Sequence, residues 1–370
     1  MSNKENKKGT GKRVALIILI VFLALVLLVL VGGTVFITGT LNKLSRPEQN
    51  ETLSPSEIEA LLDDNQYVDD LYGDGSYDVD VTEVVEETDP DVVIETIDPE
   101  DVTLPETPVE QIVSEENQDN YLNILLVGQD SRDPAKRARS DSMILCTLDK
   151  STGTLTMTSF MRDMYVKIPG YYNQRMNVAY MVGGFDALYD TLEYNFGINV
   201  DKGVAVNFQS FAKLINLVGG VEVELTDAEV RYMKGKNPDW KLSAGVNKLT
   251  GAAALTYARA RKIGGGGDFD RSQRQRNVIT ALLVKMKDMS LIDLYNLVDE
   301  VLPMVYTDMS NAEIVSMAME LAPLLKDLKV VSQRIPIDGG YRMTMVNEMS
   351  VLLPDLQKNR KFLVETIGDM

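Results

Sequence analysis

Histidine is absent from the 370 residues of this chain, and cysteine occurs once, at Cys146. Without histidine, the sequence excludes Ser–His and Cys–His nucleophiles and every metal site built on imidazole. A single cysteine excludes an intramolecular disulfide framework and a cysteine zinc site. The chemistry that remains uses carboxylates, arginines, lysines, hydroxyls and amides. These groups suit phosphoryl substrates and hard metal ions.

Charge is distributed unevenly, although the whole chain has a net charge of −18. Residues 1–46 contain 7 Lys/Arg and 1 acid, residues 47–118 contain 24 acids and no base, and residues 119–370 contain 30 of each. The acidity therefore belongs to one stretch, and the chain divides into three physically distinct parts. The length suffices for one large domain or two ordinary ones.

An uninterrupted run of 18 apolar residues occupies positions 14–31, and no charge follows it as far as Ile37. A helix of about 24 residues measures roughly 36 Å and can cross a hydrocarbon core of about 30 Å. The run has no polar face, which disfavours a buried core helix. It also exceeds the roughly 7–15 apolar residues of a cleaved signal peptide. We therefore predict an uncleaved transmembrane anchor at residues 14–38, after a basic tail at residues 1–13.

The flanking charges predict the orientation of this anchor. Five basic residues precede the run, and only Lys43 and Arg46 closely follow it. The positive-inside rule then places the N-terminus in the cytoplasm and everything beyond the anchor outside. We predict a single-pass protein of the cell membrane with an extracytoplasmic domain.

Residues 39–118 are rich in Asp, Glu, Pro and Thr and poor in aromatic residues. Such a composition predicts an extended, self-repelling linker rather than a packed unit. We interpret it as a solvating spacer between the membrane and the folded domain, with weak calcium binding as the alternative. No segment of it has EF-hand spacing.

Residues 119–370 have the pattern of one folded domain, in which short apolar strands alternate with amphipathic helices. We expect strands at residues 124–127, 143–148, 155–159, 204–206 and 221–224, and helices at residues 177–196, 208–217, 249–257, 270–286, 310–325 and 349–363. Asp268 or Asp270 is the expected cap of the helix at 270–286. The alternation predicts an α/β fold with a mixed β-sheet core and flanking helices.

Four clusters of charged residues fall where this pattern predicts strand ends or helix starts. They occupy residues 128–132, 139–141, 162–163 and 257–276. Open α/β sheets bind ligands outside the carboxyl ends of their strands, so these clusters mark the expected site.

The last cluster is the densest. Arg271, Arg274 and Gln275 sit at i, i+3 and i+4, on one face of a helix and near its N-terminus, where backbone amides favour an anion. Arg259 and Arg261 approach from the preceding segment. Converging guanidiniums repel one another unless an anion is bound, and the arginine fork fits phosphate oxygens.

A solvated basic helix with surface ion pairs is the alternative for this cluster. It is the better interpretation for Arg274 or Arg276 taken alone, but not for the whole set in a domain without net charge. The glycines at 264–267 add little, because they lack the Gly-Lys-Ser/Thr ending of a P-loop.

Asp130 and Asp141 form a candidate magnesium pair, because Mg²⁺ takes one or two carboxylates together with phosphate oxygens and water. The alternative is that each carboxylate caps a loop or pairs with Arg132 or Arg139. Nucleic acid is not an expected partner, because the extracytoplasmic part is acidic overall.

The quoted clusters belong to a longer series of motifs in residues 121–290. The series comprises residues 123–132, 139–143, 159–163, 176–180, 183–184, 206–208, 217–221, 249–251, 257–261 and 268–275. Taken together and in this order, these motifs resemble the LytR-CpsA-Psr family of bacterial cell-wall proteins. One departure from the family pattern is Asp270, which stands where the family often has Gly.

The resemblance implies an extracytoplasmic phosphotransferase that moves a glycopolymer from an undecaprenyl-pyrophosphate carrier onto a sugar hydroxyl of peptidoglycan. The implied pyrophosphate ligands are Arg139, Arg162, Arg259, Arg261, Arg271 and Gln275, and the implied Mg²⁺ ligands are Asp130 and Asp141. It further implies an α/β sandwich with an apolar pocket for the prenyl chain, whose walls could come from residues 176–192 and 278–289.

Phosphoryl transfer still needs a base near the acceptor hydroxyl, and without histidine the candidates are Asp130, Asp141 and Asp163. Asp163 has a second interpretation, in which it only orients Arg162 through an ion pair. Two other functions stay open: a membrane-anchored pyrophosphate hydrolase that uses the same site, and a module that binds an anionic glycopolymer without reacting. A transcription regulator is disfavoured by the short cytoplasmic tail.

Overall fold

The computed structural model describes residues 95–129, 137–260, 263, 267–287, 297, 300, 305–321 and 329–369. The predicted anchor at 14–38, most of the predicted linker, Asp130 and Arg261 lie outside these residues. Within the described ranges, every helix is too short or too polar to span a bilayer.

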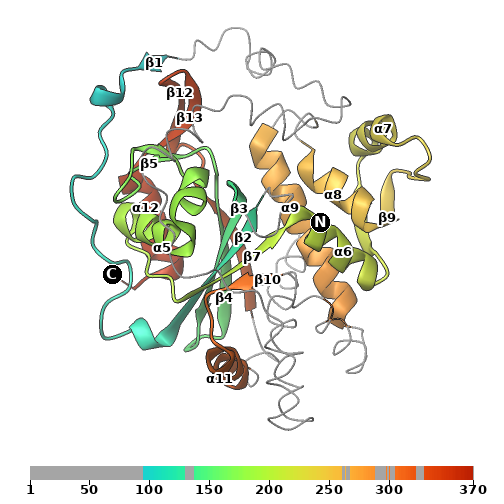
Figure 1. The fold of residues 1–370 in the computed structure, drawn as a ribbon, viewed down its shortest axis with the longest axis horizontal. Coiled ribbons are helices and arrows are strands. Elements are labelled where there is room, and N and C mark those ends of the chain that lie inside the picture. Colours follow the sequence, from blue (N-terminus) through green and yellow to red (C-terminus); the bar gives the residue numbers. More distant parts are fainter. Residues whose placement is uncertain are drawn as a thin grey trace, which may run out of the picture.

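A six-stranded mixed sheet forms the centre of the domain, in the order β10-β7-β2-β3-β4-β11 (Figure 1). Its strands are β10 (Val305–Thr307), β7 (Lys202–Asn207), β2 (Tyr121–Gln129), β3 (Ser140–Asp149), β4 (Thr154–Phe160) and β11 (Lys329–Ile335). The pairs β2/β7 and β4/β11 are parallel, while β2/β3, β3/β4 and β7/β10 are antiparallel. The predicted mixed sheet is therefore confirmed.

One edge of this sheet collects the ends of four strands. Strands β2, β4, β7 and β11 finish there at Gln129, Phe160, Asn207 and Ile335, and the antiparallel strands β3 and β10 begin there. We call it the carboxyl edge. The charged motifs at 139–141 and 162–163 flank β3 and β4 at this edge, so the topology brings them together.

Helices cover both faces of the sheet (Figure 1). One face packs against α5 (Asn177–Phe196) and α12 (Leu356–Ile367), and the other against α6 (Phe208–Leu217), α8 (Gly251–Arg259) and α9 (Gly267–Lys287). Strand β2 supplies both cores, because alternate side chains point to opposite faces. Leu125 and Val127 join the α5 core, and Leu122 joins the α8 core.

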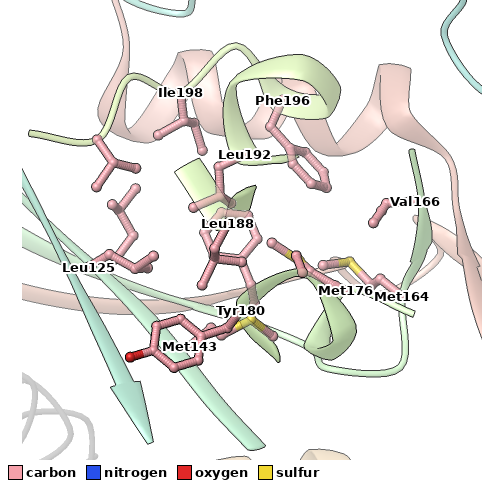
Figure 2. Packing of buried hydrophobic residues seen from close by; sticks show 14 of the residues in the cluster. Leu125, Met143, Met164, Val166, Met176, Tyr180, Leu188, Leu192, Phe196 and Ile198 are labelled. Atoms are coloured by element: carbon pink, nitrogen blue, oxygen red, sulfur yellow. The ribbon is translucent and has the colours of Figure 1, made fainter. Parts of the chain in front are cut away.

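The α5 core is the more methionine-rich of the two. Figure 2 shows Leu188 and Leu192 of α5 turned toward Leu125 and Met143 of the sheet. Phe196 at the end of α5 meets the ring of Phe160 edge-on, with centroids 5.4 Å apart. The helix bends at Gly183 and Gly184, where the backbone leaves helical angles.

Smaller elements complete the domain. They are the antiparallel pairs β8 (Val221–Leu225) with β9 (Gly245–Leu249) and β5 (Tyr165–Val166) with β6 (Gln174–Arg175), the sheet β1 (Thr96–Ile97), β12 (Tyr341–Val346) and β13 (Met349–Pro354), and the helices α7 (Asp227–Lys236) and α11 (Asn311–Leu321). Strand β1 belongs to the stretch that the sequence assigned to the linker, and it pairs in parallel with β12.

Two of the expected helices, at 177–196 and 208–217, are confirmed with their bounds. The helix expected at 270–286 begins earlier, at Gly267, so Asp268 and Asp270 lie in its first turn and neither caps it. The expected start of α8 at residue 249 is wrong, because Thr250 is the N-cap and Leu249 ends β9.

The single helix expected at 349–363 is also wrong. Residues 349–354 form β13, which pairs with β12, and α12 follows after the N-cap Asp355. Apolar periodicity does not separate a short buried strand from a helical turn. The strand partner, residues 341–346, decides the matter.

We predict that Gly251→Ala lowers the free energy of unfolding by about 1–3 kcal/mol through overpacking. A Cβ at this position would penetrate the carbonyl group of Ala212 on α6, and the Gly251 amide already donates to Asn216 Oδ1 at 2.8 Å. Denaturant titration measures the change.

Gly235→Ala in α7 is the matched control, because nothing lies within 4 Å of its added Cβ. We expect it to be neutral or stabilising by up to about 1 kcal/mol. Equal effects of the two substitutions would contradict the close approach of α6 and α8.

Candidate functional site

Arg162 lies at the centre of the charged residues on the carboxyl edge. Asp141 is the second residue of β3, and Arg162 follows the end of β4, its antiparallel neighbour. The two side chains therefore meet, with 2.6 Å between Arg162 Nη1 and Asp141 Oδ1. Asp163 Oδ2 and Asp268 Oδ1 approach Arg162 Nε at 3.5 and 3.7 Å. Three carboxylates thus surround one guanidinium.

The environment of Arg162 keeps it charged. Burial by itself would lower the pKa of this guanidinium, but the negative charges of Asp163, Asp141 and Asp268 outweigh burial and raise its pKa well above the ordinary value. The side chain is only 15% exposed. Arg162 is therefore a permanent and immobilised cation at the sheet edge.

Asp268 links Arg162 to helix α9. It lies in the first turn of the helix, where the helix dipole favours a negative charge. Its Oδ1 is 2.6 Å from Nη2 of Arg271, three residues further on, and Arg271 is almost fully buried. The sequence analysis placed Asp268 in the charged cluster and as a possible cap, but not in this ion pair. The Asp–Arg spacing of i, i+3 was the available signal for the ion pair.

Asp163 is held between two arginines. Its Oδ1 is 3.9 Å from Arg175 Nε, while its Oδ2 faces Arg162. Strand β13 braces this corner, because Leu352 N donates to Asp163 O at 2.9 Å and Arg175 donates to Ser350 O at 2.6 Å. The ion pair with Arg162 that the sequence analysis considered for Asp163 is thus present, and its role in orienting Arg162 stays a prediction. Arg175 was missed, because its motif carries no other charged residue.

Asp141 pairs with Arg162, a partner that the sequence analysis did not name, while Arg132 lies outside the described residues. It is the described member of the predicted magnesium pair, since Asp130 lies outside the described residues. No group of three or more potential metal ligands occurs among the residues that the structure describes. A site with one or two carboxylates is compatible with that finding, so magnesium stays a prediction.

The remaining predicted ligands lie on or beside β3, α8 and α9. Arg139 is partly buried just before β3, Arg259 is exposed at the end of α8, and Gln275 is partly buried on α9. Arg261 is not among the described residues. Arg137, which was not predicted, lies against the bend of α5, where a Cβ on Gly184 would be 3.0 Å from its Nη1.

Arg274 has a different role from the one predicted. It is buried, and it donates to Glu229 Oε1 at 3.0 Å, to Ala260 O at 2.7 Å and to Ile263 O at 2.5 Å. These bonds anchor the segment that follows Arg259. Arg274 is therefore neither an anion ligand nor part of a surface ion pair. Asp270 Oδ2 is 3.9 Å from Arg274 Nη2.

The predicted walls of an apolar pocket belong to the packed cores. Met176, Leu188 and Leu192 are buried in the α5 core, and Val278 and Leu282 in the α8 core. A cavity of about 220 Å³ lies at the opposite edge of the sheet, lined by polar groups at the start of β2 and the end of β3. It is remote from the charged residues described above.

The LytR_cpsA_psr family model matches residues 94–366, which extend from before β1 into the last turn of α12. This chain belongs to the LytR-CpsA-Psr family. The match extends beyond the residues 121–290 that carry the sequence resemblance. Strands β11 to β13 and helix α12 are therefore part of the family domain.

Among relatives in the family, the teichoic acid–peptidoglycan transferase TagT of Bacillus subtilis is 31% identical over 253 residues, which cover 66% of this chain and 77% of TagT. TagV of the same organism is 35% identical over 175 residues, 46% of this chain and 45% of TagV. Biofilm regulatory protein A of Streptococcus mutans is 29% identical over 249 residues, 61% of each chain. The aligned part thus spans about half of TagV.

Solved structures of the family share the fold. Bacillus subtilis TagT superposes with a TM-score of 0.54 at 27% identity, covering 72% of this chain and 98% of that one. TagT bound to LIIa-WTA gives 0.55 at 28%, covering 72% and 99%. TagT with bound octaprenyl pyrophosphate lipid gives 0.52 at 26%, covering 72% and 99%.

We predict that Arg274→Met lowers the free energy of unfolding by about 3–5 kcal/mol, because it leaves Glu229 charged and buried. Adding Glu229→Gln should recover part of this loss, since no unpaired charge then remains. Chemical denaturation of the three variants tests the coupling.

Lys285→Met is the control on the same helix, because Lys285 is exposed. It should change the free energy of unfolding by less than about 0.5 kcal/mol. Additive effects of Arg274→Met and Glu229→Gln would contradict the pairing.

Proposed function

We propose that this chain is a membrane-anchored, extracytoplasmic phosphotransferase that attaches a glycopolymer from an undecaprenyl-pyrophosphate carrier to peptidoglycan. The observation that carries the proposal is the placement of Arg162 and Arg271, two buried arginines joined through Asp268, at the carboxyl edge of the sheet. The transferase names of TagT and TagV, and the octaprenyl pyrophosphate in a TagT structure, support it.

The arginine arrangement suits a pyrophosphate. Because Arg162 and Arg271 are held in place by carboxylates before any ligand arrives, binding costs little side-chain entropy. Charged donors aimed at the phosphate oxygens stabilise the charge that develops during phosphoryl transfer. Arg139, Arg259, Arg261 and Gln275 complete the proposed ligand set.

In the proposed reaction, the oxygen of the acceptor sugar hydroxyl attacks the phosphorus that bears the glycopolymer. The bond from that phosphorus to the bridging oxygen breaks, and the lipid phosphate leaves with the bonding electrons. The hydroxyl proton passes to a carboxylate. The candidates for this role are Asp130, Asp141 and Asp163, of which Asp141 and Asp163 lie beside Arg162.

Asp130 and Asp141 would also hold Mg²⁺, which neutralises phosphate charge when it is bound. Asp141 suits this role as a carboxylate with a side chain 10% exposed at the beginning of a strand. The predicted anchor at 14–38 and the acidic linker would keep the domain next to its lipid-linked donor.

We predict that Arg259→Ala reduces transfer at least about 100-fold, because one fork of phosphate contacts is lost in the transition state. Arg259 is exposed, so the variant should fold normally. Arg231→Ala removes an exposed arginine of α7 and is the control. The assay follows sugar–phosphate addition to peptidoglycan fragments by mass.

The same assay separates the alternatives. Release of free polymer without addition would favour a hydrolase, and tight binding with neither product would favour a binding module. Arg162→Ala is a poorer probe, because it removes the cation that pairs with Asp141 and one of the two arginines beside Asp163. Arg162→Lys keeps the charge and removes the fork.

We further predict that Mg²⁺ together with inorganic pyrophosphate raises the melting temperature of the wild type, and that Asp141→Asn abolishes the magnesium-dependent part of the shift. Asp239→Asn, at an exposed carboxylate beyond α7, should leave the shift intact. A full magnesium response in Asp141→Asn would refute the assignment of this ligand.

A further inference from the structure

Arg276 on α9 is a buried cation with only neutral partners. It is 8% exposed, and it donates to Ser159 Oγ at 3.1 Å, Ser272 Oγ at 2.9 Å and Gln273 Oε1 at 2.7 Å. Its Nε is buried and makes no hydrogen bond, and no carboxylate among the described residues pairs with it. Burying an uncompensated charge is unfavourable, so the ligand-free structure does not explain this side chain.

A second arginine lies beside it. Arg334 on β11 stands directly across from Ser159 of β4, the residue to which Arg276 donates. Burial, followed by the positive charge of Arg334, lowers the pKa of Arg276 to about 10. The guanidiniums of Arg276 and Arg334 therefore repel each other. The hydrogen-bond partners of Arg276 are all neutral hydroxyl and amide groups.

Among the described residues, a carboxylate pairs with Arg334 but none pairs with Arg276. Asp338 pairs with Arg334 through a hydrogen-bonded ion pair, and the side chain of Asp338 is 90% exposed. The guanidinium of Arg334 instead lies over the ring of Phe269, 4.4 Å from its centroid. Arg334 is 22% exposed, so this member of the pair is reachable from the surface.

This pair borders the proposed pyrophosphate site. On α9, Asp268, Arg271 and Gln275 follow one another at i, i+3 and i+7 and form one face. Phe269, Ser272 and Arg276 have the same spacing and form the neighbouring face, about 100° around the helix. Ser159 is likewise three residues before Arg162 on the strand that leads to the site. One helix thus presents two cationic faces at one end of the sheet.

We propose that Arg276 and Arg334 form a second oxyanion subsite, which takes a phosphodiester group of the glycopolymer beside the pyrophosphate. This inference rests on the proposed function and makes it more specific. The donor would be a polymer with phosphate in its chain, such as a polyol phosphate, rather than a neutral polysaccharide. A phosphodiester offers two free oxygens, one for each guanidinium fork.

The test measures binding of two probes to the full-length chain in detergent micelles by calorimetry. The probes are a short glycerol-phosphate oligomer and inorganic pyrophosphate. We expect Arg276→Gln and Arg334→Gln each to lower the affinity for the oligomer at least about tenfold. The affinity for pyrophosphate should change less than about twofold. Arg342→Gln, at an exposed arginine of β12, is the control and should change neither.

Stability of the ligand-free protein provides a second readout. A structural arginine lowers the melting temperature when it is replaced. An arginine whose role is to bind an anion does not lower the melting temperature of the free protein when it is replaced. Arg276→Met should therefore have an unchanged or higher melting temperature, and the oligomer should no longer stabilise it. A lowered melting temperature together with unchanged oligomer affinity in Arg334→Gln would overturn the proposal.

Further arms identify the source of the anion. Equal affinity for a polycarboxylate oligomer would overturn the assignment to phosphate. Binding to phosphatidylglycerol vesicles that depends on Arg276, without binding of the soluble oligomer, would assign the subsite to a lipid headgroup. This result would overturn the proposal that the subsite binds the polymer. Failure of the wild type to bind pyrophosphate would count against the proposed function itself, independently of the response of Arg276 to the oligomer.

Discussion

The buried guanidinium of Arg162, enclosed by Asp141, Asp163 and Asp268, is the interaction on which the charged end of this domain depends. It joins the start of β3, the end of β4 and the first turn of α9. Because a buried charge is tolerated only with its counter-charges in place, these three elements are held in one mutual geometry. Arg271 extends the arrangement through Asp268. The cost of burial is offset within the network, and its cations remain directed at one edge of the sheet.

Helix α9 shows how one amphipathic sequence supports several tasks. Arg271 shares a carboxylate with the central cation, Arg274 ties down the backbone at Ala260 and Ile263, and Arg276 meets only neutral groups. All three are buried, although each looks like a surface residue in the sequence. Rotation of about 100° per residue is enough to send neighbours to different environments. The number of arginines in a motif therefore does not equal the number of ligands.

Much of the fold follows from local pattern. The helices α5 and α6 have their expected bounds because both lie between clear strand and glycine signals. The pattern failed for 349–363, where a strand precedes the last helix. It was silent on β11, whose partner β4 lies far away in the chain, and on β12, which lies between its neighbour β13 and the distant strand β1. Short strands are specified by pairing, and pairing is a non-local property.

The sequence by itself determined the chemistry available to this protein, the α/β class and the motifs of the family, because residue types, periodicity and motif order are written along the chain. Only the tertiary structure decided which charges meet. It paired Asp141 with Arg162, which is 21 residues away, and it brought Asp268 to the same cation from beyond α8. It also left Arg276 beside Arg334 without a carboxylate among the described residues. Partners of buried charges are chosen by the crossing of strands and helices, which spacing in the sequence does not encode.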